Sequence, residues 1–141
     1  MDRARFDDYV ARFNAEDATA FDDYLSPEVA VQNGGLHYTG VQGMKDHYAR
    51  IWGTFRETLN VQRYVADAHS AAVHLKTHFE ALKDADTSPF GPVRRGECFD
   101  YDGVVFYDLD ASGRFSRILV SYLSFTRTGV DGVTHSLGLA H

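Results

Sequence analysis

Acid–base chemistry could be carried by four polar side chains that lie far apart in the sequence: Tyr9, Asn33, His47 and Tyr101. Histidine titrates near neutral pH, which makes His47 the candidate general acid or base. A tyrosine hydroxyl can donate a hydrogen bond to a developing oxyanion, and the amide of Asn33 can orient a carbonyl group or a water. Purely structural roles are the alternative: core tyrosines, a half-exposed helix residue for His47, and a turn residue before Gly34-Gly35 for Asn33.

A second group of candidates lies on one predicted strand. His74 and His78 share a face, with Lys76 between them and Glu80 beyond, a pattern that invites a metal site. That face is polar and no third ligand is evident, so we predict a solvated or dimer-forming face, with no metal and no cofactor. Cys98 is the only cysteine and no base is predicted near it, so we do not expect it to act as a nucleophile.

Charge and composition narrow the possible partners. The chain has 141 residues and a formal net charge of −6, which argues against binding nucleic acid or an anionic membrane surface. No apolar run approaches a membrane span, and one cysteine without a disulfide partner favours a cytoplasmic location. This length fits one domain, predicted at residues 1–128, followed by a Gly-rich, loose tail at 129–141.

The chemistry must be positioned by helices in the first half of the chain. Three segments carry apolar residues at helical spacing. The first has Phe6, Tyr9, Val10 and Phe13 on one face. The second has Phe21, Tyr24 and Leu25, and ends at Ser26-Pro27. The third begins at Gly40 and has a stripe formed by Val41, Met44, Tyr48, Ile51 and Phe55.

Strands occupy most of the remaining sequence. Alternating patterns predict strands at residues 28–33, 36–38, 58–68, 71–82, 97–108 and 115–127, with a loop at 83–95. Helices gathered in the N-terminal half and long antiparallel strands in the C-terminal half indicate an α+β fold with helices on one face of the sheet. A strongly bent sheet in this arrangement leaves a conical hollow.

Four segments resemble the nuclear-transport-factor-2-like (NTF2-like) superfamily, also called SnoaL-like. Residues 9–17 (YVARFNAED) resemble the first helix of ketosteroid isomerase, and residues 26–33 resemble its first strand. Tyr38-Thr39-Gly40 with Gly43 and Tyr48 resembles the turn into the third helix, and Gly113-Arg114-Phe115 the last hairpin. The resemblance implies a cone-shaped, curved sheet with three helices enclosing one pocket. The superfamily also includes scytalone dehydratase, limonene-epoxide hydrolase and polyketide cyclases.

The same resemblance implies that the best-known catalytic sets are incomplete. Tyr9 matches an oxyanion donor of ketosteroid isomerases, but Asn33 replaces their proton-shuttling aspartate and Val105 their second donor. Asn33 matches an asparagine of limonene-epoxide hydrolases, whose tyrosine and aspartate are replaced by Val31 and Ser121. We therefore expect a pocket without a carboxylate, in which His47 supplies the acid–base group.

Side chains of the predicted third helix and of the predicted strands are expected to contact the ligand. These are Trp52, Arg63, Leu75, Phe79, Phe99, Tyr107, Val120 and Tyr122. Such a mostly apolar set with a few polar groups is typical of a small-molecule site.

Two functions fit this pocket. The first is a cofactor-independent acid–base enzyme, such as a lyase, dehydratase, isomerase or cyclase, acting on a hydrophobic, aromatic or polycyclic molecule. The alternative is a non-catalytic small-molecule-binding or dimerisation module. The resemblance implies a homodimer, for which Leu119, Leu123 and Phe125 are the predicted apolar outer positions.

Overall fold

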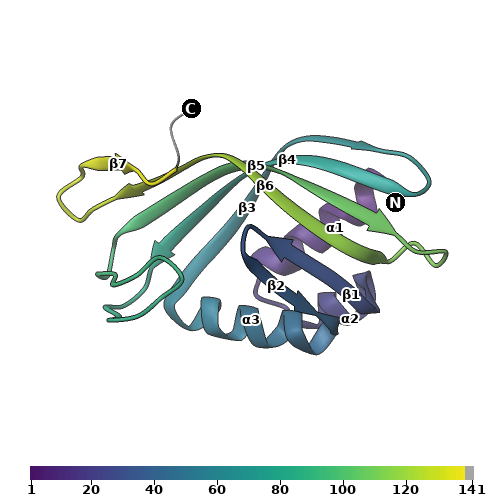
Figure 1. Cartoon of the computed structure of the whole chain (residues 1–141), viewed down its shortest axis with the longest axis horizontal. Coiled ribbons are helices and arrows are strands. Elements are labelled where there is room, and N and C mark those ends of the chain that lie inside the picture. The colour runs from purple at the N-terminus through teal and green to yellow at the C-terminus, as the bar shows by residue number, and fades with distance from the viewer. Residues whose placement is uncertain (139–141) are drawn as a thin grey trace.

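Three helices cover the concave face of a strongly curved, seven-stranded mixed sheet (Figure 1). The computed structural model describes residues 1–138. Its elements in chain order are α1 (Arg3–Asn14), α2 (Thr19–Tyr24), β1 (Leu25–Asn33), β2 (Leu36–Thr39), α3 (Gly40–Thr54), β3 (Phe55–Ala66), β4 (Ser70–Ala81), β5 (Cys98–Leu109), β6 (Phe115–Thr128) and β7 (Thr134–Ser136). The predicted α+β architecture, with three helices in the N-terminal half and a curved sheet, is confirmed. Within the described residues no helix is both long and apolar enough to cross a membrane.

The helices form where the apolar periodicity predicts them. α1 is capped by Asp2, whose carboxylate accepts a hydrogen bond from the backbone N–H of Arg5 at 2.8 Å. Its predicted apolar face is buried in the core. α3 ends at Thr54, and Phe55 is extended and begins β3, so assigning Phe55 to the helix was wrong.

The strands run in the order β2-β1-β6-β5-β4-β3, and only the β1–β6 pair is parallel among these neighbours. All six predicted strands are present with boundaries shifted by a few residues. The tail contains a seventh, β7, which pairs with the end of β6, so the tail is not loose throughout. Residues 139–141 of that tail lie outside the described part of the chain.

Two register shifts change which side chains face the helices. In β3 the pairing with β4 slips between Val61 and Arg63, and Arg63 is exposed on the outer face. In β6 the pairing with β5 slips beside Gly103, and Phe125 turns inward to pack with Phe99. Because a bulge adds one residue to one strand, alternation restarts with the opposite parity. The outward prediction for Phe125 was therefore wrong.

Two apolar clusters hold the layers together. The larger lies between α1, α2, α3 and the centre of the sheet, and includes Phe6, Phe13, Phe21 and Phe115. The smaller lies where β3, β4 and β5 meet the β4–β5 loop, and contains Ile51, Phe55, Phe79, Ala81, Val93 and Phe99. Phe79 belongs to the smaller cluster and also reaches the hollow described next.

Candidate functional site

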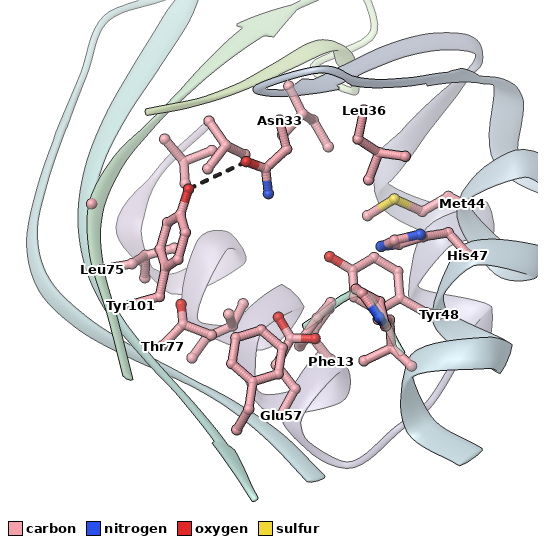
Figure 2. A pocket seen from close by; sticks show the side chains of 18 of the residues that line it. Phe13, Asn33, Leu36, Met44, His47, Tyr48, Glu57, Leu75, Thr77 and Tyr101 are labelled. Atoms are coloured by element: carbon pink, nitrogen blue, oxygen red, sulfur yellow. Dashed lines mark hydrogen bonds between the residues drawn. The ribbon is translucent and has the colours of Figure 1, made fainter. Parts of the chain in front are cut away.

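A cavity of about 170 Å³ lies between the concave face of the sheet and helices α1 and α3 (Figure 2). Eight predicted site residues line it: Tyr9, Asn33, His47, Leu75, Phe79, Tyr101, Tyr107 and Val120. Strand alternation positions the sheet residues, while α1 and α3 supply Tyr9 and His47. These eight side chains come from six elements of the fold, namely α1, β1, α3, β4, β5 and β6.

Four predicted contact residues do not line the cavity. The ring of Trp52 packs behind Phe13 and Tyr48, with ring centres 5.5 and 5.4 Å away. Phe99 is fully buried in the smaller cluster, and Arg63 is exposed on the outer face because of the β3 bulge. Trp52 and Phe99 face the interior but pack in the core beside the cavity, and the β3 bulge turns Arg63 away from it.

Tyr122 is the fourth predicted contact residue that does not line the cavity. It is 43% exposed and packs against Tyr101 with 5.1 Å between ring centres. The contact takes place outside the cavity, since Tyr122 is absent from the lining. Tyr122 can therefore orient Tyr101, which does line the cavity.

The cavity contains a carboxyl group that the sequence interpretation overlooked. Glu57 on β3 is only 5% exposed and lines the cavity. In Figure 2 its carboxyl group points into the hollow from the side opposite Asn33. The expectation of a pocket without a carboxylate was wrong. The signal was present in the alternation of Phe55, Glu57, Leu59 and Val61, but the predicted strand began at residue 58.

The surroundings of Glu57 are apolar. Its cross-strand neighbour on β4 is Phe79, and its Oε2 atom is buried without a hydrogen-bond partner within residues 1–138. A carboxylate in such a place loses its hydration and gains no counter-charge, so the neutral acid is favoured. Burial raises the pKa of Glu57 to about 8. At neutral pH it is therefore mainly a protonated acid.

His47 reaches the cavity from α3. Its ring stacks on Tyr38 with centres 5.0 Å apart and meets Tyr48 edge-on at 4.9 Å. Burial, and secondarily the positive charge of Arg50, lower the pKa of His47 below its usual 6.5. At neutral pH the imidazole is therefore uncharged and able to accept a proton.

Tyrosine hydroxyls are the other polar groups deep in the site. Burial is the main cause of the raised pKa of Tyr9, Tyr48 and Tyr107, and Glu57 contributes to the shifts of the first two. These hydroxyls keep their protons at neutral pH and remain hydrogen-bond donors. Figure 2 shows the Tyr48 hydroxyl directed into the same hollow as the Glu57 carboxyl group.

Asn33 and Tyr101 form a polar pair at the rim. The Tyr101 hydroxyl on β5 donates to Oδ1 of Asn33 on β1 at 3.2 Å, across the intervening strand β6 (Figure 2). Asn33 is exposed, and its neighbour Leu36 is 42% exposed while also lining the cavity. The mouth is therefore on this side, and the pair is placed to contact a ligand as it enters.

The histidines of β4 lie on the opposite, outer face of the sheet. His74 Nε2 contacts Asp102 Oδ1 at 2.5 Å, and His78 Nδ1 contacts Asp100 Oδ1 at 2.7 Å. Over residues 1–138 no group of three or more His, Cys, Asp or Glu side chains is arranged to hold a metal ion. Each histidine instead pairs with an aspartate of the neighbouring strand β5.

Comparison with known proteins agrees with this architecture. The profile of the family described as SnoaL-like domain matches residues 6–118. A putative polyketide cyclase from Xanthomonas campestris pv. campestris superimposes with a TM-score of 0.72 at 21% identity, over 85% of this chain and 88% of that one. An LEH-like epoxide hydrolase from M. tuberculosis gives 0.67 at 12% identity, over 85% and 80%.

A designed protein shares the fold as well. The computationally designed 17-OHP binder superimposes with a TM-score of 0.66 at 12% identity, over 94% of both chains. Among curated proteins there is no match. At these identities the solved structures establish the fold, and its chemistry must be argued from the cavity itself.

Proposed function

The chain belongs to the SnoaL-like domain family, and on that premise we propose that it is a cofactor-independent acid–base enzyme for a hydrophobic, ring-containing small molecule. One observation carries the proposal: Glu57 and His47 line the same apolar cavity, and their surroundings shift their pKa values in opposite directions. Two titratable groups pushed apart in this way divide the roles of acid and base between them.

The proposed roles follow from the protonation states. His47, uncharged at neutral pH, accepts a proton from a carbon or hydroxyl group of the substrate. Glu57, protonated at neutral pH, donates a proton to a carbonyl oxygen or a leaving hydroxyl group. One proton is taken and one is given, so the step needs no metal and no redox partner. Isomerisation, dehydration and ring closure are all reactions of this kind.

The remaining lining residues support binding and orientation. Tyr9 is buried beside the acid and donates to the oxygen on which negative charge develops. Asn33 and Tyr101 orient the substrate at the rim. The apolar walls take the ring system and are formed by Leu75, Phe79, Tyr107 and Val120.

The single cysteine supports a cytoplasmic location.

The proposal can be tested without knowing the natural substrate. Neutral cyclic ketones are incubated with the protein in D2O, and exchange of the protons beside the carbonyl group is followed by NMR. The wild type should accelerate exchange of at least one ketone, and Glu57→Gln and His47→Gln should each slow it on the order of a hundredfold. Glu80→Gln, on the outer face of β4, is the matched control and should leave exchange unchanged.

A ligand-binding protein without catalysis is the rival function. It is favoured by the likeness to the designed 17-OHP binder, which uses this fold without any stated reaction. The same assay separates the two. Ketones that bind the cavity but exchange no faster than in buffer would support the binding protein and contradict the enzyme.

We also propose a homodimer formed through the outer face of the sheet. Val104 and Phe106 on β5 are 39% and 41% exposed there, next to the partly buried Leu119 of β6. Apolar side chains gathered on one face favour a second copy of the chain as cover. Sedimentation at micromolar concentration should give the mass of a dimer, and Phe106→Asp should shift it to the monomer. A monomeric wild type would contradict this proposal.

A further inference from the structure

The loop between β4 and β5, residues 82–97, folds back over one end of the cavity. An isolated bridge between Ala85 and Val93 makes it a short hairpin. At its tip the Ser88 hydroxyl accepts from the Phe90 backbone N–H, and Gly91 takes a positive φ of 80° to complete the turn. The tip is therefore an ordered turn that presents Phe90 in one orientation.

Phe90 is the aromatic residue of this loop and is half-buried. It lines the cavity, yet its ring also lies in the smaller apolar cluster, 4.5 Å from the ring centre of Phe99 and 5.0 Å from that of Phe79. Phe125 and Phe55 complete its surroundings at 5.1 and 5.2 Å. The ring is thus a partition between the cavity and the aromatic cluster behind it.

This partition stands beside the acid. Phe79, whose ring meets that of Phe90 edge-on, is the cross-strand neighbour of Glu57. A substrate bound with its reacting end at Glu57 therefore meets the Phe90 ring next. At this end of the cavity the wall is formed by the loop residues Pro89 and Phe90, while the other lining residues belong to helices and strands.

The loop is fastened at its base. Glu97 is buried and accepts two hydrogen bonds from the guanidinium group of Arg127 on β6, at 2.7 and 2.8 Å. The same guanidinium group donates to the carbonyl oxygen of Pro92 at 3.1 Å, and the backbone N–H of Arg94 donates to Glu97. These contacts hold the loop against the sheet, so that the position of Phe90 is set by the fold.

We propose that Phe90 determines specificity by setting the maximum length of ring-containing substrate that the cavity accepts. The inference rests on the proposed function in one respect, namely that this cavity is where the substrate binds. Replacing the ring by a methyl group joins the cavity to the space next to Phe99 and Phe125. The variant can then accommodate a longer hydrophobic substituent than the wild type.

Binding of 4-alkylphenols of increasing chain length tests this. Trp52, the only tryptophan, contacts the cavity-lining rings of Phe13 and Tyr48 and reports binding by fluorescence. In the wild type, each added methylene group should lower Kd roughly fourfold until the limit is reached, after which affinity should stop rising. In Phe90→Ala the limit should move to a chain at least two carbons longer.

Two further variants make the outcome decisive. Phe90→Leu should also move the length limit to longer chains, but by a smaller amount than Phe90→Ala. It replaces Phe90→Ala if urea or thermal unfolding shows that the alanine variant is not folded under the assay conditions. Leu82→Ala, an exposed position at the start of the same loop, is the control and should keep the wild-type limit. An unchanged limit in both folded Phe90 variants, or no binding of any 4-alkylphenol to the wild type, overturns the proposal.

The result is separable from that of the proposed function. Glu57→Gln should keep the wild-type length limit and lose exchange activity. A shifted limit in Phe90→Ala, together with unchanged exchange activity in Glu57→Gln, would leave the role of Phe90 in place and remove the acid–base role of Glu57.

Discussion

Glu57 and Phe79 stand directly opposite each other on β3 and β4, and both side chains face the cavity. A carboxyl group is therefore paired across the sheet with an aromatic ring, where a cation or a hydrogen-bond donor would be the usual partner for a buried acid. The pairing explains why the proton is retained at neutral pH. It also places the acid where hydrophobic substrate is held.

The pH dependence of activity follows from these two groups. Glu57 must be protonated to act as the acid, so kcat/KM should fall as the pH rises through about 8. His47 must be uncharged to act as the base, so kcat/KM should also fall as the pH drops through its lowered pKa, below 6.5. Rate measurements from pH 5 to 9 should give a bell-shaped curve, and Glu57→Gln should remove its alkaline limb. Activity that rises through pH 8 would reverse the assignment.

Stability should depend on pH through the same carboxyl group. Its pKa is about 8 in the folded protein against 4.5 for the ordinary group, so between these values the folded state holds a proton that the unfolded state has lost. The contribution of this raised pKa to the free energy of unfolding is fully present below pH 4.5 and is lost as the pH rises towards 8. The difference in free energy of unfolding between wild type and Glu57→Gln should fall by up to roughly 1.4 kcal/mol per pH unit in this window.

Urea unfolding at several pH values between 5 and 8.5 measures that difference. Groups common to both proteins cancel, so the slope isolates Glu57. The exposed Glu80→Gln should show no comparable slope against the wild type. A difference between wild type and Glu57→Gln that stays constant with pH would mean that Glu57 is solvated in the folded protein.

Removing the Tyr9 hydroxyl should act on the chemical step. Tyr9→Phe keeps the ring that packs in the core and removes only the donor, so kcat should fall on the order of a hundredfold with a smaller change in KM. Steady-state kinetics with an exchanging ketone measures both constants. Tyr24→Phe is the matched control, because Tyr24 packs beside Tyr9 but donates to Asp8. Equal effects in the two variants would assign Tyr9 to packing alone.

The rim pair should affect binding more than chemistry. Asn33→Ala and Tyr101→Phe should each raise KM severalfold and leave kcat within about twofold, since the pair lies at the mouth. Their effects on kcat/KM should be coupled by about 1 kcal/mol, the net value of one hydrogen bond. Fully additive effects in the double variant would show that the two side chains act separately.

Periodicity predicted the elements well and the site only in part. Tyr9, Asn33, His47 and Tyr101 line one cavity. They were predicted from the superfamily resemblance together with helix and strand repeats, which fix the direction of a side chain over several residues. Arg63 does not face the cavity, because the bulge after Val61 reverses which side chains of β3 point inward. No repeat in the sequence marks a bulge.

The remaining errors have similar local causes. Glu57 was missed because α3 passes into β3 with no intervening turn, and the strand therefore begins three residues earlier than its clear alternation. Phe90 lies on a loop, where no period indicates which side chain turns inward. The acid and the partition of the cavity are thus features that required the three-dimensional structure.

The most direct test of the central claim needs no substrate. The side-chain carboxyl carbon of Glu57, identified by its loss in Glu57→Gln, can be followed by 13C NMR from pH 3 to 10. A proton held by burial in the apolar cavity predicts a midpoint of about 8. A midpoint near the ordinary value of 4.5 would contradict the claim that Glu57 is the acid of this site.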